Sequence, residues 1–114
     1  MQGLIDAARA ANVIIATAES CTGGMVSAAI TNTAGSSAAF DRGFVTYTNA
    51  AKIRMLGVRP ETLDAFGAVS EQVAKEMAEG AVANSDAQLS VAITGIAGPG
   101  GSEHKPEGRV CFGL

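Results

Sequence analysis

Aromatic and basic residues are scarce in this chain, and their scarcity narrows the function it can have. Its 114 residues include no tryptophan and a single tyrosine, and its formal net charge is −3. The lysines and arginines are scattered and do not alternate with aromatic side chains. The sequence therefore offers neither a basic stripe to neutralise phosphates nor a surface on which bases stack. We expect no nucleic-acid partner.

Metal-ligating residues and export signals are also lacking. The two cysteines, Cys21 and Cys111, lie far apart and His104 is the single histidine, so no zinc-ligand spacing is present. The N-terminus lacks the charged and then apolar segments of a secretory signal. The longest apolar runs of the chain are too short to cross a bilayer. These absences predict a cytoplasmic protein with no metal ion and no membrane partner.

Small apolar residues are what the chain has in abundance. Hydrophobic residues make up 47% of it, and helical periodicity alternates with short β-branched runs. We predict one α/β domain over residues 1–114, with three layers and a central mixed or mostly parallel sheet flanked by helices. The predicted strands are 13–17, 40–48, 88–94 and 109–114. The predicted helices are 2–11, 25–31, 50–56 after an Asn49 cap, one starting at Pro60, and a longer one after a Ser70 cap.

The last part of the sequence differs in composition from the rest. Residues 95–108 are rich in glycine and proline, and a loop of that length in a compact domain is usually functional or disordered. The strand predicted over 109–114 has no helix after it to cover it. We therefore expect the domain to lack its last strand and helix in this chain.

The turn after the first strand is the strongest candidate for chemistry. It reads Ala18-Glu19-Ser20-Cys21-Thr22-Gly23-Gly24. Ser20 lies beyond the carboxyl end of a predicted strand, where open α/β sheets bind their ligands. The main-chain N–H groups around Thr22, Gly23 and Gly24 would hold a phosphate or an oxyanion at the helix N-terminus. The alternative is a structural turn, in which Ser20 caps the helix and the glycines allow a tight bend.

Lys52 is the best candidate for activating a serine hydroxyl. It is predicted at the third helical position after Asn49, where the helix dipole and partial burial would lower its pKa. A neutral lysine takes up the proton that a nucleophilic serine must lose. Tyr47, five residues earlier, would orient the lysine or relay the proton. A solvated lysine and an amphipathic tyrosine at the sheet edge are the alternatives.

Other candidates have weaker support. Cys21 would be reactive if its pKa were lowered near the helix N-terminus, but a packing role fits better because no histidine partner is evident. We expect His104 at the surface, Lys105 as a phosphate contact, and Cys111 in the core. The glycines of 94–102 would wrap a ligand or form an anion nest, or simply make a surface loop. This segment lacks the GK[ST] ending of a P-loop.

The order of several motifs resembles the CinA C-terminal domain family, which includes the nicotinamide-nucleotide amidases. The motifs are TAESCTGG (17–24), GSS (35–37), RGFVTYTN (42–49) followed by Ala51-Lys52, GAVSE (67–71) and TGIAGPGG (94–101). The similarity runs from about residue 16 to 113, so it covers nearly the whole chain. Several motifs in one order are far more specific than any one of them.

The resemblance implies an enzyme that deamidates nicotinamide mononucleotide to nicotinate mononucleotide and ammonia, with no metal or organic cofactor. It implies Ser20 as nucleophile, Lys52 as base and Tyr47 in an assisting role. The residues implied to line the substrate pocket are Thr22, Gly23, Gly24, Asn49, Thr94, Gly95 and Ala97. The partner would be a small-molecule nucleotide, and we expect a homo-oligomer because the sheet is incompletely covered.

Two alternatives stay open from the sequence. One is a catalytically inactive nucleotide-binding or sensor module of the same fold. The other is an amidase that acts on a different small amide with the same residues.

Overall fold

A computed structural model of the chain describes residues 1–95 and the main chain of 110–113. Its helices and strands follow one another as α1 (Gln2–Ala11), β1 (Ile15–Glu19), α2 (Met25–Thr31), the short 3₁₀ turn η1 (Ser36–Ala38), β2 (Phe40–Val45), α3 (Asn49–Leu56), α4 (Pro60–Phe66), α5 (Glu71–Ala83), β3 (Leu89–Gly95) and β4 (Val110–Gly113). The sheet order is β2-β1-β3-β4. β1 is parallel to both neighbours, and β4 is antiparallel to β3. The predicted mixed, mostly parallel sheet is confirmed.

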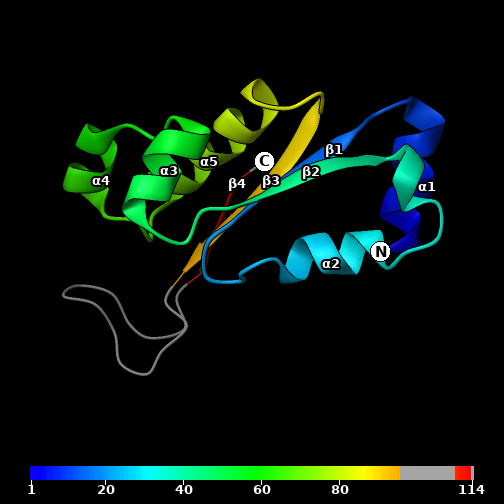
Figure 1. Cartoon of the computed structure of the whole chain (residues 1–114), viewed down its shortest axis with the longest axis horizontal. Coiled ribbons are helices and arrows are strands. Elements are labelled where there is room, and N and C mark those ends of the chain that lie inside the picture. The colour runs from blue at the N-terminus through cyan, green and yellow to red at the C-terminus, as the bar shows by residue number, and fades with distance from the viewer. Residues whose placement is uncertain (96–109, 114) are drawn as a thin grey trace.

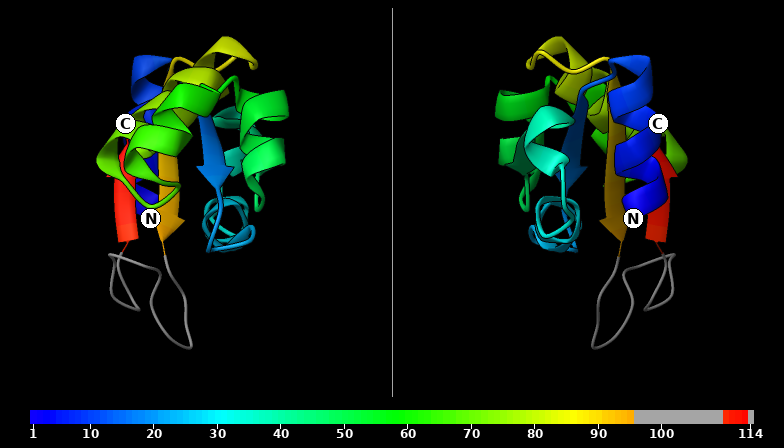
Figure 2. Two further views of the ribbon diagram at one scale, coloured as in Figure 1. Left: turned by 90° about the vertical axis from the view of Figure 1, so that its left-hand side faces the viewer. Right: turned by 90° about the vertical axis from the view of Figure 1, so that its right-hand side faces the viewer.

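Helices cover both faces of the sheet, which makes the three predicted layers (Figures 1 and 2). On one face, Ala16 and Ala18 of β1 pack against apolar side chains of α3, α4 and α5, including Met77. On the other face, Ile15 packs against Ile5 of α1 and residues of α2. All five residues of β1 are buried, as expected of a central strand that has a layer of helices on each side.

Three of the predicted boundaries are wrong, and local hydrogen bonds explain the differences. The first strand begins at Ile15 rather than Val13, because the Val13 N–H closes the end of α1 by donating to Ala8 O at 2.8 Å. The cap of α3 is Thr48, not Asn49: Thr48 Oγ1 accepts from the Ala51 N–H at 3.0 Å. β2 correspondingly ends at Val45 rather than at residue 48.

The crossing of α5 over the end of α3 depends on Gly80. This glycine is buried within α5, and a Cβ built on it would lie 2.7 Å from the carbonyl carbon of Leu56. The backbones of the two helices therefore approach more closely than any other residue type allows. The contact fixes α3, the helix that carries Lys52, against the body of the domain.

We predict that Gly80→Ala destabilises the protein, although alanine is the better helix former. The gain in helix propensity is about 1 kcal/mol, whereas forcing a methyl group into a backbone contact costs about 1–3 kcal/mol or more. Urea denaturation followed by circular dichroism measures the net effect. Glu79→Ala on the exposed face of α5 is the matched control, expected to change stability by less than about 0.5 kcal/mol. A Gly80→Ala protein more stable than wild type would contradict the close crossing.

Candidate active site

Three hydroxyl side chains lie in a row where the parallel strands end. Ser20 follows β1, Thr46 follows β2 and Thr94 is near the end of β3, and all three are buried. The pairing of the strands continues past β1, because Thr46 N–H donates to Glu19 O and Ser20 N–H donates to Ile93 O. Side chains alternate along a strand, so the three hydroxyls continue the sheet face that α3 and α5 cover. This is the end of the sheet at which α/β proteins bind their ligands.

The amino group of Lys52 is buried against this row. Lys52 is only 1% exposed, and its Nζ donates to Ser20 Oγ at 3.0 Å. Two main-chain carbonyls complete its surroundings, Thr46 O at 3.0 Å and Tyr47 O at 3.4 Å. Because Thr48 is the helix cap, Lys52 is the fourth residue of α3 rather than the third as predicted. The structure thus brings together the two residues that the sequence proposed as nucleophile and base.

The pKa of Lys52 lies below its ordinary value, and burial is the main cause. Removing the ammonium ion from water disfavours the charged form, while the neighbouring Cys21 acts in the opposite direction wherever its thiol ionises. The sequence had predicted the same direction, with the helix dipole as a contributing cause. A neutral amine beside a serine hydroxyl can accept its proton. The two carbonyl oxygens then stabilise the ammonium group that forms.

Tyr47 and Asn49 flank the lysine from the segment between β2 and α3. The side chain of Tyr47 is 69% exposed, and its contact with Lys52 is made by its main-chain carbonyl. Asn49 is exposed as well, and both residues line the cavity beside Ser20. The catalytic role of the Tyr47 hydroxyl and the binding role of Asn49 stay predictions.

Cys21 adjoins Ser20 but does not have the properties of a reactive thiol. Burial raises the pKa of Cys21 above its ordinary value, although main-chain N–H groups of Cys21 and Thr22 and the nearby Lys52 act to lower it. The residue is therefore a neutral thiol near pH 7, which favours the packing role that the sequence analysis preferred.

The N-terminus of α2 already holds an anion, the carboxylate of Glu19. Its Oε1 accepts from the Gly24 N–H at 3.2 Å and from Thr22 Oγ1 at 2.6 Å. The Gly23 N–H donates to Ser20 O. The N–H groups of Gly23 and Gly24 are thus engaged within the protein, and their role in holding a substrate phosphate or oxyanion stays a prediction.

A cavity of about 220 Å³ opens beside Ser20 and Lys52. Its described lining consists of Ser20, Cys21, Tyr47, Asn49, Lys52, Ala68, Val69, Thr94 and Gly95. Thr94 ties two walls together, because its Oγ1 donates to Ala68 O at 2.9 Å across the connection from α4 to α5. Ala68 and Val69 were missed as candidates, although the motif GAVSE contains both. Among the predicted pocket residues, Thr22, Gly23 and Gly24 lie in the adjoining turn, outside this lining.

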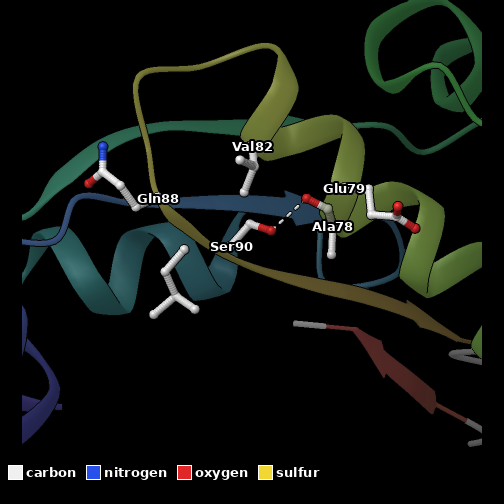
Figure 3. Close-up of a pocket in the computed structure, with 6 residues that line it drawn as sticks. Ala78, Glu79, Val82, Gln88 and Ser90 are labelled. Carbon is white, nitrogen blue, oxygen red and sulfur yellow. Dashed lines mark hydrogen bonds between the residues drawn. The ribbon is translucent and has the colours of Figure 1, made fainter.

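A second hollow, of about 330 Å³, lies between α5 and the start of β3 (Figure 3). Its lining residues are Ala78, Glu79, Val82, Gln88, Leu89 and Ser90. The Ser90 hydroxyl donates to Ala78 O at 2.6 Å, so it is engaged in joining β3 to α5. Among the described residues no base hydrogen-bonds to Ser90, so the hollow is less suited to catalysis than the smaller cavity beside Lys52.

Several predictions fall outside the part of the chain that the structure describes. Ala97, His104 and Lys105 are in the undescribed segment, and of Cys111 only the main chain is described. Within the described residues there is no cluster of three metal-ligating side chains and no helix long and apolar enough to cross a membrane.

Comparison with known protein families shows to which family the chain belongs. The family model described as the CinA C-terminal domain matches residues 1–114. The chain belongs to the CinA C-terminal domain family. The crystal structure of a CinA superfamily protein from Escherichia coli superposes with a TM-score of 0.94 at 42% identity, covering 97% of this chain and 65% of that one. The crystal structure of a competence/damage inducible protein from Agrobacterium tumefaciens superposes with a TM-score of 0.92 at 56% identity, covering 96% of this chain and 67% of that one.

Curated relatives within the CinA family carry two kinds of name. A nicotinamide-nucleotide amidohydrolase PncC from Escherichia coli K12 is 59% identical over 93% of this chain, and one from Enterobacter agglomerans is 60% identical over 85%. A CinA-like protein from Chlorobium phaeobacteroides is 57% identical over 90%. The matched part of the chain spans 65%, 60% and 24% of the length of these three relatives.

We predict that the Cys21 thiol is slow to alkylate at neutral pH, because its pKa is raised. The rate of reaction with iodoacetamide, measured by mass spectrometry in a Cys111→Ser background, should still be rising above pH of about 8.5, the ordinary pKa of a cysteine. A rate that levels off below that pH would mean a stable thiolate and would restore Cys21 as a rival nucleophile.

Proposed function

We propose that the protein is an amidohydrolase that converts nicotinamide mononucleotide to nicotinate mononucleotide and ammonia. The observation that carries the proposal is the 3.0 Å contact between the buried Lys52 Nζ and Ser20 Oγ. The names of the PncC relatives supply the substrate, and the cavity beside Ser20 supplies space for the amide group of that substrate.

In the proposed first step, Ser20 Oγ attacks the carboxamide carbon while neutral Lys52 accepts the hydroxyl proton. The tetrahedral intermediate collapses as the Lys52 ammonium returns this proton to the departing nitrogen, which leaves as ammonia. An ester between Ser20 and the nicotinate group remains. Lys52 then takes a proton from water as the resulting hydroxide attacks the ester. When this second intermediate collapses, Lys52 returns the proton to Ser20 Oγ, and the acid product leaves and becomes a carboxylate by losing its own proton to the solvent.

The negative oxygen of the intermediate needs hydrogen-bond donors. The main-chain N–H groups of Cys21 and Thr22 directly follow the proposed nucleophile. Among the described residues neither donates to a main-chain carbonyl, although both lie near the Cys21 sulfur. In many serine hydrolases the N–H after the nucleophile serves this purpose. We propose the same role for Cys21 and Thr22, in place of the N–H groups of Gly23 and Gly24.

We predict that Ser20→Ala and Lys52→Arg each lower kcat by about 10³-fold or more, since each removes an indispensable part of one proton-transfer unit. Arginine keeps the positive charge but stays protonated, so it cannot act as the base. Ammonia release from nicotinamide mononucleotide measures activity, and circular dichroism checks that both variants remain folded. Near-normal turnover by either variant would refute the mechanism.

The wild-type protein distinguishes the alternatives in the same assay. A catalytically inactive nucleotide-binding module would bind nicotinamide mononucleotide in calorimetry yet release no ammonia. An amidase with another substrate would release ammonia from a different small amide and show no activity on the mononucleotide.

A further inference from the structure

The carboxylate of Glu19 is completely buried at the end of the central strand. Five hydrogen bonds reach it. Oε1 accepts from Thr22 Oγ1, the Gly24 N–H and the Val26 N–H, at 2.6, 3.2 and 2.9 Å. Oε2 accepts from the N–H and the hydroxyl of Ser27, at 2.9 and 2.7 Å. The carboxylate thus satisfies the N–H groups at the start of α2, which the helix itself leaves free.

Hydrogen-bond donors, rather than a basic side chain, stabilise the charge of Glu19. The ion pairs found among the described residues involve Asp41, Asp86 and Glu61 instead. Burial acts to raise the pKa of Glu19, but the hydrogen bonds from Thr22, Ser27 and Val26 outweigh it and hold the pKa below its ordinary value. Glu19 is therefore ionised throughout the neutral range.

Glu19 connects to both members of the Ser20–Lys52 pair. Its side chain binds Thr22 and Gly24, so it closes the turn that begins at Ser20. Its main-chain carbonyl accepts from the Thr46 N–H at 2.8 Å, and the carbonyl of Thr46 in turn binds Lys52 Nζ. The turn contains two glycines with positive φ, of 61° and 112°, so its backbone needs such an external restraint to hold one conformation.

A second layer of hydrogen bonds fixes Glu19 itself. Ser27 has one hydroxyl proton and gives it to Glu19, so Thr17 Oγ1, 2.6 Å away, must donate to Ser27 Oγ. A Cβ at Gly43 would collide with both of these hydroxyl oxygens, so only glycine leaves them room. This network lies on the face of the sheet opposite Lys52.

We propose that Glu19 is a positioning residue for the nucleophile: its carboxylate holds the 20–24 turn so that Ser20 Oγ stays in contact with Lys52. This inference rests on the proposed function, in which Ser20 attacks the amide. Glu19 itself touches neither Lys52 Nζ nor Ser20 Oγ through its side chain, and so acts through the turn.

The test is the reactivity of Ser20 in Glu19→Gln. Glutamine has the shape of glutamate, but it is neutral and has one acceptor oxygen where the carboxylate has two. In either orientation its NH₂ group faces main-chain N–H donors, those of Gly24 and Val26 or that of Ser27, so the hydrogen bonds that restrain the turn are weakened. A small fluorophosphonate reports this directly: Ser20 Oγ forms a bond to phosphorus, fluoride leaves and Lys52 takes the proton. Intact-mass measurement over time gives the labelling rate. We expect this rate and kcat to fall together by about 10-fold or more, with KM changing by less than about 3-fold. The reason is that a misplaced Ser20 hydroxyl slows its attack more than it weakens substrate binding.

The matched control is Glu76→Gln. Glu76 also stabilises the start of a helix, accepting from the Arg59 N–H and from Thr62 Oγ1, but it lies away from Ser20. The Glu76→Gln substitution should lower the melting temperature of the protein and leave the labelling rate of Ser20 unchanged. Ser27→Ala keeps the Glu19 charge, removes one of its donors and serves if Glu19→Gln does not fold; a labelling rate reduced by at least about 3-fold is expected there.

The outcomes separate the two proposals. A Glu19→Gln protein that is folded and labelled as fast as wild type overturns the positioning role, whatever the substrate. If Glu19→Gln is unfolded, a Ser27→Ala protein labelled at the wild-type rate overturns it in the same way. Wild-type protein that is labelled but releases no ammonia from nicotinamide mononucleotide overturns the proposed function and leaves the role of Glu19 standing. Wild-type protein that is not labelled at all overturns both.

Discussion

The burial of one lysine amino group against one serine hydroxyl is the constraint on which this structure depends. A buried ammonium ion is costly unless polar groups surround it, and in the domain core Lys52 finds one hydroxyl and two carbonyl oxygens. The position of those oxygens requires β1 in the centre of the sheet and β2 beside it. The position of the amine requires α3, which Thr48 starts and Gly80 of α5 holds in place.

The two faces of the sheet serve this pair in different ways. On the face covered by α3, α4 and α5, the cavity gives access to Ser20 and Lys52. On the opposite face, Glu19 and Ser27 tie the turn to α2. Alternation along β1 explains the division, since Glu19 and Ser20 are neighbours in sequence and point to opposite faces. The N-terminus of α2 therefore holds the turn that follows Ser20, and the cavity beside Ser20 and Lys52 lies on the other side of the sheet.

Much of the fold could be predicted from the periodicity of apolar residues. Most of the candidate site could be predicted from the polar residues at the carboxyl ends of the predicted strands. The strand-turn-helix segment around Ser20, the helix start at Pro60 and the cap Ser70 are where the pattern placed them. Thr48 and Asn49 are adjacent residues of capping type, and only the backbone geometry decides between them. The proximity of Lys52 to Ser20 was predicted from the serine's need for a base, but the burial of Lys52 depends on α5, far away in sequence.

Glu19 was missed because charge in a buried strand has no periodic signature. The sequence shows a glutamate before a serine, and nothing in that order reveals five donors folding back from residues 22–27. The clue was available in physical terms: a carboxylate within a fully buried five-residue strand must find donors, and the nearest unpaired N–H groups are those of the next helix.

The most direct measurement of the central claim is the titration of the Lys52 side chain itself. Protein labelled with ¹³C-lysine gives a Cε resonance for each of three lysines, and the one lost in Lys52→Arg belongs to Lys52. We predict that this resonance titrates clearly below about 10.4, the ordinary pKa of lysine. A Lys52 that titrates at or above that value would remain charged beside Ser20 and could not act as its base.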